Sequence, residues 1–478
     1  MNGRTKIVAT IGPASEAADV LEAMMRAGVD VIRLNLSHGL LDEHLERLRM
    51  VRAASVAVGK PIAILADLPG PKIRAGRFPE GGTALGVGQI VRILPGGGAS
   101  DSVTVTVDYD SLLLDVQPGD RVVIGDGGIC LRCTSVGEDA LLTRVESGGL
   151  VQGRPGVHLP SERSRLTAPT DEDLVLAVAM AEYGVDFLGI SFVRDAKDVE
   201  AVRAAIAPHP TRLVAKIETA PALANLESIA AVSDAVMVAR GDLGIECPLE
   251  DVPHLQKKII RHCVEIGVPV ITATQMLESM IDAPAPTRAE VSDVANAVFD
   301  GTDAVMLSAE TAIGHDPVLV VQTMALIAER AESEASYAQW SARLGRVQRE
   351  LWNDTSQRIT MAITHACALA AADAGAAAIL CCTKSGRTAA AMARFRPGAK
   401  LIGVSPDAAT VRAMALTWGV HPIQVDSYRS TDELVWYAIE SAVREGLIER
   451  GSVVAVLAGA PDRPSGAATD VLRLVRVE

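Results

Sequence analysis

Eight short apolar runs alternate with Ala- and Leu-rich stretches in this chain, and this alternation constrains the fold more than any other feature. The intervening stretches, such as residues 17–27 and 198–207, have helical periodicity. Such alternation is typical of parallel βαβ units. Eight strands fit a closed (β/α)8 TIM barrel, and an open doubly wound sheet is the alternative. The runs are residues 6–11, 31–36, 62–65, 187–192, 213–217, 235–239, 268–273 and 303–307.

Two parts of the chain depart from this rhythm. Residues 73–166 are rich in Gly, Val and Thr and contain several turn signals, which predicts a small all-β unit inserted in a barrel loop as a lid. After residue 335 the strand–helix pattern starts again, which predicts an open α/β unit joined by a polar helix or linker at 335–356. We therefore expect domains at 1–70, 71–167, 168–340 and 341–478, the second being the lid and the fourth regulatory.

Charge and composition exclude several classes of function. The net charge of −14 and the 3% of aromatic residues argue against nucleic-acid binding. The sequence contains no run of about 18 apolar residues, so no membrane span is expected, and the N-terminus does not resemble a signal peptide. Seven scattered cysteines are typical of reduced thiols in the cytoplasm. The single CxxC, Cys130 and Cys133, is interpreted as two thiols of one strand rather than a zinc site.

Polar residues gather at the C-terminal ends of the predicted barrel strands, the face on which barrel enzymes build active sites. One such residue could be merely solvated, but six of the eight strands carry them. Alternate residues of a strand share a face, which groups most of these side chains in pairs. They are Arg33, Asn35 and Ser37; Asp67; Lys216 and Glu218; Arg240, Gly241 and Asp242; Thr272 and Thr274; and Ser308 and Glu310.

The residue types at these strand ends indicate a chemistry. Glu218 and Asp242 offer oxygen ligands with no His or Cys nearby in sequence, which favours Mg²⁺ or Mn²⁺. A group of cations reaches the same rim, and cations around a divalent metal suit a phosphate-bearing substrate. Phosphoryl transfer requires mainly positioning and charge neutralisation, which this set supplies. The cations are Arg33, Lys72, Arg74 and Lys216.

Several longer stretches are similar to motifs of the pyruvate kinase family. The resemblance covers almost the whole chain, and the motifs occur in the family's order. It implies phosphoryl transfer from phosphoenolpyruvate to ADP in glycolysis, a homotetramer and a cytoplasmic location. The stretches are residues 6–15 (KIVATIGPAS), 33–39 (RLNLSHG), 216–218 (KIE), 238–244 (VARGDLG), 274–280 (TQMLESM) and 306–311 (MLSAET).

The resemblance also implies roles for individual residues. Lys216 stabilises the transferring phosphoryl oxygens, and Glu218 and Asp242 hold the divalent metal. Asp126 closes over the nucleotide side. The implied catalytic residues are Lys216, Arg33, Arg74, Thr274, Ser308 and Glu310, the last three on the path that protonates enolpyruvate. Substrate contacts are implied for Arg33, Lys216, Gly241, Asp242 and Thr274, and nucleotide contacts for Arg33, Asn35, His38 and Arg74.

Two departures from the family's usual pattern bear on ions and nucleotide. Lys72 stands where many members have Glu, and its fixed ammonium would repel K⁺. We therefore expect activity without K⁺, although a Lys72 turned to solvent would leave an ordinary K⁺ site. The monovalent-cation region comprises Asn35, Ser37, Asp67, Leu68 and Lys72. Glu172 replaces a Lys that in many relatives helps to bind nucleotide phosphates.

A possible effector site follows a predicted strand in the C-terminal unit. Hydroxyls and amides before a helix can cradle a phosphate, and this stretch resembles the family's sugar-phosphate site. The loop 459–469 lacks an evident Trp or the usual basic residue for a second phosphate, so a monophosphorylated sugar or a nucleotide is expected, with a vestigial cradle as the alternative. The cradle comprises Thr383, Lys384, Ser385, Gly386, Arg387 and Thr388.

Two other functions remain open at this point. A metal-dependent lyase or aldolase acting on a pyruvate enolate would share Glu218 and Asp242, but it would need neither Lys216 nor a lid. An inactive regulatory relative is the other alternative, and the presence of every catalytic residue type argues against it.

Overall fold

A computed structural model describes residues 3–125, 127–161, 163, 165–335, 337, 340, 344, 355–426, 430–459 and 468–478 of the 478. Asp126, most of the expected connecting segment 335–356 and most of the loop 459–469 lie outside these residues.

Eight parallel strands close into a barrel, which confirms the TIM-barrel prediction. Barrel strands are covered on both faces, which explains why their sequences are continuous apolar runs; every residue of β1, β3 and β14 is buried. Each strand begins and ends within about two residues of the expected run. The strands are β1 (Lys6–Thr10), β2 (Val31–Asn35), β3 (Ala63–Asp67), β12 (Phe187–Ile190), β13 (Arg212–Ile217), β14 (Ala235–Ala239), β15 (Val270–Ala273) and β16 (Ala304–Leu307).

Helices surround the barrel, and local signals fix where several of them begin. Thr170 and Thr287 each accept a hydrogen bond from the third residue of the following helix, forming capping boxes. The α-helices are α1 (Ala18–Ala27), α2 (Leu41–Val58), α4 (Asp171–Glu182), α5 (Ala196–Ala205), α6 (Ala220–Ala224), α7 (Leu226–Val232), α8 (Arg240–Glu246), α9 (Val252–Ile266), α10 (Arg288–Asp300), α11 (Ala309–Ala312) and α12 (Pro317–Glu334). Two 3-10 turns, η1 (Leu249–Asp251) and η2 (Glu278–Ile281), follow α8 and β15.

Between β3 and β12 the chain leaves the barrel and forms a β unit with its own hydrophobic core, called the lid below. Its main sheet has the order β11-β7-β8-β9-β5-β6, and β10 pairs with β4. The insertion is not purely β as predicted, because it also contains a short helix, α3 (Leu112–Asp115). The strands are β4 (Thr83–Leu85), β5 (Ile90–Pro95), β6 (Thr104–Val107), β7 (Arg121–Ile124), β8 (Ile129–Val136), β9 (Leu141–Ser147), β10 (Gly149–Val151) and β11 (Val157–His158).

The C-terminal unit is a five-stranded sheet in the order β19-β18-β17-β20-β21, flanked by helices. Its last strand, β21, runs antiparallel to β20 and was not predicted. The elements are α14 (Thr355–Asp373), β17 (Ala378–Cys382), α15 (Arg387–Ala393), β18 (Lys400–Ser405), α16 (Ala408–Ala413), η3 (Met414–Leu416), β19 (Val420–Gln424), α17 (Thr431–Arg444), β20 (Val453–Ala458) and β21 (Val471–Arg476).

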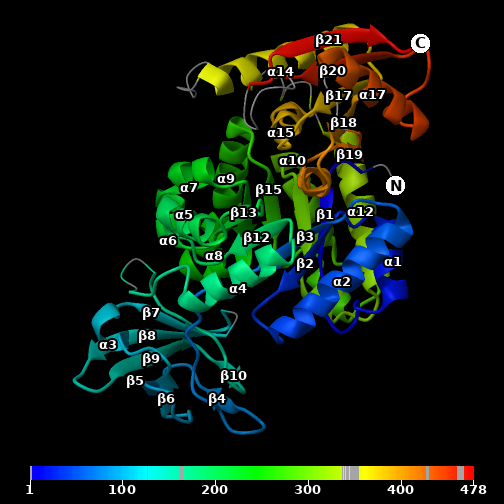
Figure 1. The fold of residues 1–478 in the computed structure, drawn as a ribbon. Coiled ribbons are helices and arrows are strands. Elements are labelled where there is room, and N and C mark those ends of the chain that lie inside the picture. The colour runs from blue at the N-terminus through cyan, green and yellow to red at the C-terminus, as the bar shows by residue number, and fades with distance from the viewer. Residues whose placement is uncertain are drawn as a thin grey trace.

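The lid and the C-terminal unit lie at opposite ends of the barrel (Figure 1). The lid, in blue to cyan, hangs beside α4 and α8, while the C-terminal unit, in yellow to red, lies beyond α10 and β15. Cys130 and Cys133 are both buried on β8, as expected for two thiols of one strand. In the described part of the chain, no helix is both long and apolar enough to cross a bilayer.

Candidate active site

A lysine and two carboxylates meet at the C-terminal ends of β3 and β13. The Nζ atom of Lys216 lies 3.5 Å from Asp67 Oδ1 and 3.4 Å from Glu218 Oε2, and both carboxylates are buried. Burial alone would lower the pKa of Lys216. The carboxylates of Asp67, Glu218 and Asp242 outweigh burial and hold this pKa above its usual value. Lys216 is therefore a fixed positive charge inside the barrel mouth.

The Glu218 carboxylate has one oxygen engaged and one available. Its Oε1 accepts a 2.6 Å hydrogen bond from the Phe192 amide, whereas the buried Oε2 forms no hydrogen bond with the described residues and has only its ion pair with Lys216, 3.4 Å away. Burial raises the pKa of Glu218 to about 7, and the charge of Asp242 adds to this shift against the opposing effect of Lys216. A buried carboxylate held in this way gains stability when a cation binds its free oxygen.

Asp242 supplies a second carboxylate from the first turn of α8. It lines the same cleft as Lys72, and its negative charge stabilises the Lys72 ammonium. Across the described ranges, no three His, Cys, Asp or Glu side chains cluster as a complete metal site. Mg²⁺ commonly uses one or two protein carboxylates and takes its other oxygens from substrate and water. The free oxygen of Glu218 and the carboxylate of Asp242 therefore fit a divalent metal of this kind.

Arg33 is fixed beside the lysine by two elements. Its guanidinium forms a 2.7 Å ion pair with Asp67 Oδ2 and donates a 3.1 Å hydrogen bond to Thr10 Oγ1. Burial would raise the pKa of Asp67, but Lys216 and Arg33 hold it below its usual value. Asp67 thus orients both cations at the base of the site.

Several residues of the expected monovalent-cation region form hydrogen bonds within the chain. The Lys72 ammonium donates a 2.6 Å hydrogen bond to Ser37 Oγ, and the Ser37 amide donates to Asn35 Oδ1 at 3.2 Å. The carbonyl oxygen of Leu68 accepts a 2.7 Å bond from Ser191 Oγ. The Lys72 side chain is exposed, and its ammonium is directed toward Ser37.

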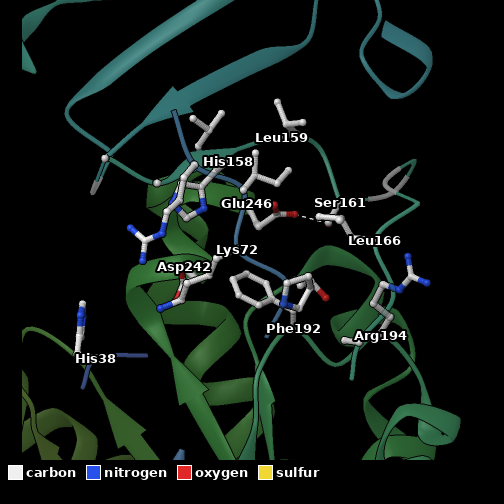
Figure 2. Close-up of a pocket in the computed structure, with 18 residues that line it drawn as sticks. His38, Lys72, His158, Leu159, Ser161, Leu166, Phe192, Arg194, Asp242 and Glu246 are labelled. Atoms are coloured by element: carbon white, nitrogen blue, oxygen red, sulfur yellow. Dashed lines mark hydrogen bonds between the residues drawn. The ribbon is translucent and has the colours of Figure 1, made fainter. Parts of the chain in front are cut away.

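A cavity of about 290 Å³ separates the barrel mouth from the lid. Figure 2 shows Lys72 and Asp242 below it and His158 with Ser161 above it. The Ser161 hydroxyl donates a hydrogen bond to Glu246 of α8, which ties the returning lid segment to the barrel. His38 and Arg74 also line this cavity.

The cavity is strongly cationic on the side nearest β2. Burial lowers the pKa of His38, and the positive charges of Lys72, Arg74 and Arg33 lower it further. Arg74 is held by a 3.3 Å hydrogen bond from its Nη1 to the carbonyl oxygen of Arg154 in the lid. Such a concentration of positive charge suits polyanionic ligands, although the chain as a whole is acidic.

The remaining predicted catalytic residues lie on turns after β15 and β16. Gly241 donates its amide to Thr274 Oγ1 at 2.9 Å, which joins the starts of two loops. Glu310 was expected beside Ser308 on a strand, but β16 ends at Leu307 and Glu310 belongs to α11. Its buried carboxylate accepts hydrogen bonds from the amides of Ser308 and Leu277. Glu310 thus joins the turn after β15 to the turn after β16.

One strand-end pairing predicted from the sequence is not part of the site. Thr272 is fully buried in β15, where its hydroxyl bonds to Thr302 at 2.9 Å. The alternation rule fails here because the chain leaves the strand at Ala273 and Thr274 already adopts a left-handed conformation, with φ of 70°.

The sequence reasoning missed three residues that shape the site. Ser191 accepts a 2.7 Å hydrogen bond from Lys216 Nζ, Thr10 binds Arg33, and the Phe192 amide binds Glu218. Thr10 and Ser191 stand at the ends of β1 and β12, so applying the strand-end rule to all eight strands would have found them. The role of Phe192 is carried by its main chain and leaves no signal in its side-chain type.

The predicted effector cradle follows β17 and precedes α15. The Thr383 hydroxyl accepts hydrogen bonds from the amides of Ser385 and Gly386, at 3.3 and 2.9 Å. Thr388 Oγ1 lies 2.7 Å from Thr469 Oγ1. The stretch faces a cavity of about 1170 Å³, which is also lined by Phe187 and other residues at the N-terminal ends of the barrel strands.

Comparison with known proteins agrees with this geometry. The family model described as "Pyruvate kinase, barrel domain" matches residues 2–321, and "Pyruvate kinase, alpha/beta domain" matches residues 361–475. The chain belongs to the pyruvate kinase family. Members of this family are phosphotransferases that require a divalent metal, and the chain is a phosphotransferase.

Curated pyruvate kinases resemble the chain over nearly its whole length. That of Clostridium acetobutylicum is 39% identical, covering 99% of this chain and 100% of the relative. That of Methylorubrum extorquens is 40% identical, covering 99% and 97%. The enzyme of Geobacillus stearothermophilus is 40% identical over 98% of this chain, but this covers only 79% of the relative.

Proposed function

We propose that the chain transfers the phosphoryl group of phosphoenolpyruvate to ADP, giving pyruvate and ATP in glycolysis. The observation that carries this proposal is the buried group of Lys216 and Glu218, in which a fixed cation stands 3.4 Å from a carboxylate oxygen that forms no hydrogen bond with the described residues. A phosphoryl group would neutralise the charge of Lys216, and a divalent metal would neutralise that of Glu218. Family membership and relatives named pyruvate kinase agree with it.

On the phosphoenolpyruvate side, cations and metal ligands have separate tasks. Lys216 and Arg33 contact the phosphoryl oxygens and neutralise the charge that spreads over them during transfer. Glu218 and Asp242 hold Mg²⁺ or Mn²⁺, which when bound neutralises the oxygens of the substrate carboxylate and the developing enolate. Gly241, at the start of α8, would border the substrate carboxylate, and its amide donates to Thr274 Oγ1.

On the ADP side, the cationic wall of the cavity binds the nucleotide phosphates. His38 and Arg74 line the cavity, and Asn35 ends β2 at the barrel mouth, so closing the lid would bring Arg74 onto the phosphates. Excluding water in this way strengthens each electrostatic contact. Asp126, expected over the nucleotide, lies outside the described residues.

After phosphoryl transfer, enolpyruvate must gain a proton at C3. Thr274 and Ser308 stand on neighbouring strand ends and carry hydroxyls suited to pass a proton from solvent. Glu310 supports this path by fixing the two turns through the Ser308 and Leu277 amides.

We propose that K⁺ is not required. Lys72 already places an ammonium on Ser37, and Asn35 Oδ1 and the Leu68 carbonyl oxygen each accept a hydrogen bond within the chain. A monovalent cation in this region would have to approach the positive charge of Lys72.

The other expectations of the sequence also stay proposals. They are a homotetramer in the cytoplasm, domain limits at 1–70, 71–167, 168–340 and 341–478, and a monophosphorylated sugar or nucleotide at the 383–388 cradle. Since Thr383 already occupies the amides of Ser385 and Gly386, an effector phosphate would have to contact the side chains of Lys384, Arg387 and Thr388, of which Thr388 is bonded to Thr469.

The decisive experiment is pyruvate formation from phosphoenolpyruvate and ADP with Mg²⁺, first in buffer free of K⁺ and then with K⁺ added. Turnover that K⁺ barely changes supports both the reaction and the role of Lys72. Turnover only with K⁺ keeps the reaction and refutes the ammonium argument. No turnover in either buffer, even with sugar phosphates added, refutes the proposed reaction.

A further inference from the structure

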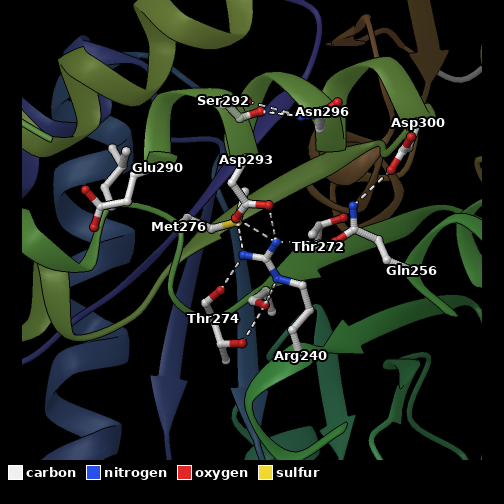
Figure 3. A network of polar contacts seen from close by, with 12 residues as sticks. Arg240, Gln256, Thr272, Thr274, Met276, Glu290, Ser292, Asp293, Asn296 and Asp300 are labelled. Atoms are coloured by element: carbon white, nitrogen blue, oxygen red, sulfur yellow. Dashed lines mark hydrogen bonds and ion pairs between the residues drawn. The ribbon is translucent and has the colours of Figure 1, made fainter. Parts of the chain in front are cut away.

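Arg240, the first residue of α8, uses all three of its guanidinium nitrogens to join parts of the chain that are distant in sequence (Figure 3). Nε donates to the carbonyl oxygen of Ala273 at 3.2 Å, and Nη2 donates to that of Thr274 at 2.6 Å. Nη2 also lies 2.7 Å from Met276 Sδ. The guanidinium therefore contacts three of the four residues of the turn 273–276, called the Thr274 turn below.

The Thr274 turn is held in an unfavourable backbone conformation. Thr274 and Gln275 have φ angles of 70° and 55°, in the left-handed region that residues with a Cβ rarely adopt. Each such residue costs about 1 kcal/mol or more and persists only where the surroundings fix it. The bonds from Arg240 to the carbonyls on either side of this conformation are contacts that can fix it.

The turn sets the place of the Thr274 hydroxyl. Thr274 Oγ1 accepts the Gly241 amide at 2.9 Å and donates to the Ala273 carbonyl at 2.6 Å. That carbonyl also accepts Arg240 Nε. The guanidinium and the hydroxyl thus share one acceptor, and a shift of the turn would move the hydroxyl away from α8.

The guanidinium is itself fixed from two helices. Asp293 of α10 forms a 2.7 Å ion pair with Nη1, and Gln256 of α9 accepts from the same nitrogen at 3.3 Å. Gln256 is oriented in turn by its 3.0 Å bond to Asp300. Only 10% of the Arg240 side chain is exposed. A lysine could keep the charge near Asp293 but could not reproduce the planar fork that reaches the turn.

We propose that Arg240 is a positioning residue whose guanidinium holds the Thr274 turn so that the Thr274 hydroxyl can deliver a proton to enolpyruvate. This inference rests on the proposed function. In the step concerned, the π electrons of the enolate form a C–H bond at C3 with the proton, and an oxygen lone pair restores the C2 carbonyl. The hydroxyl recovers its proton from water. Phosphoryl transfer precedes this step and depends on Lys216 instead.

The test separates the two half-reactions in six proteins: wild type, Arg240→Lys, Arg240→Ala, Thr274→Val, the Arg240→Lys/Thr274→Val double variant and the control Asp293→Asn. Phosphoryl transfer is followed by ATP formation under single-turnover conditions. Proton transfer is followed by exchange of the pyruvate methyl protons into D₂O with Mg²⁺ and phosphate. Asp293→Asn is the matched control, because it removes the charge of the ion pair, while the Asn oxygen can still accept from Nη1 and every atom that bonds to the turn remains.

We expect Arg240→Lys to slow methyl exchange about 100-fold, as for other small displacements of reacting groups, with ATP formation changed by less than about threefold. The double variant should exchange no more slowly than Thr274→Val alone, because both changes remove the same contribution. Asp293→Asn should retain most of the exchange. Millimolar guanidinium should partly restore exchange to Arg240→Ala, whereas equal urea should not.

Hydrogen–deuterium exchange of the backbone gives a readout independent of activity. The peptide that contains residues 270–277 should lose protection in Arg240→Lys but not in Asp293→Asn. Unchanged protection would overturn the proposal, as would equal losses of both half-reactions in proportion to a lower melting temperature. If wild type neither forms ATP nor exchanges protons, the proposed function fails, and the backbone readout still decides whether Arg240 holds the turn.

Discussion

The Lys72 ammonium donates a 2.6 Å hydrogen bond to the hydroxyl of Ser37. Ser37 in turn donates its amide to Asn35 Oδ1, so a single charged side chain organises the region where the family resemblance implies a monovalent cation. Burial lowers the pKa of Lys72, and the positive charges of Lys216 and Arg74 lower it further.

Reversing this charge should create a need for K⁺. In Lys72→Glu the positive charge is lost and a carboxylate takes its place, so we expect activity without K⁺ to fall at least about tenfold and to recover partly on adding K⁺. Initial rates with tetramethylammonium as the ionic-strength control measure this. Lys258→Glu, an equal change on the exposed face of α9, should behave as wild type. A Lys72→Glu enzyme indifferent to K⁺ would contradict the prediction.

Replacing Lys216 by Met should separate two reactions. Phosphoryl transfer should fall by about three orders of magnitude, because the fixed cation at the phosphoryl oxygens is lost. Methyl-proton exchange of pyruvate should persist within about tenfold, since it does not pass through the phosphoryl group. Loss of exchange together with phosphoryl transfer, at an unchanged melting temperature, would count against this division of roles.

Glu218 should make the stability of the metal-free protein depend on pH. Its pKa in the folded chain is raised from 4.5 to about 7, so the folded state binds the proton more tightly than the unfolded state does. The stability gained in this way is complete below about pH 4.5 and is lost as pH rises through about 7. Melting temperatures without metal should therefore fall over this range by a few degrees more than in Glu218→Gln.

Glu218 should also make the affinity for the metal depend on pH. Mn²⁺ affinity, measured by the paramagnetic resonance of free Mn²⁺, should weaken about tenfold per pH unit below pH 7 because the proton competes for the carboxylate. In Glu218→Gln the affinity should be low at every pH. A flat pH profile in wild type would show that Glu218 does not bind the metal.

Gly70, in the link from β3 to the lid, should tolerate no side chain. Its φ is 68°, and a Cβ would lie 2.7 Å from the Phe192 ring and 2.8 Å from Ser191 Cβ. Gly70→Ala should cost about 3 kcal/mol of unfolding free energy, combining backbone strain with the clash. Gly59→Ala shares a φ of 70° but meets nothing within 4 Å, so it should cost only about 1 kcal/mol. Urea unfolding of both variants measures the difference.

The barrel and most of its strand-end residues could be predicted because they depend on local signals. Continuous apolar runs such as Ala235–Ala239 reveal doubly covered strands, and the polar residue that ends each run marks one face. Strand β21 could not be found in this way. Its residues are mostly half-buried or exposed, and its pairing with β20 is set by the sheet edge that it covers.

The partners of the site residues were beyond such reasoning. That Glu310 binds main-chain amides, or that Arg240 reaches the turn after a neighbouring strand, depends on how loops from separate βα units meet. Sequence spacing does not predict these contacts between loops, since each loop leaves its strand at a different residue. The contacts between units therefore appear only in three dimensions.

The lid departs after β3 and returns before β12, and these two strands are hydrogen-bonded neighbours. The two ends of the insertion consequently sit side by side on a barrel that is closed without it, and the lid has a core of its own. The lid is therefore a structurally separable module of the fold. Replacement of the lid by another could change nucleotide binding while leaving Lys216, Glu218 and Asp67 in place. The binding sites for the two substrates can therefore evolve at separate rates.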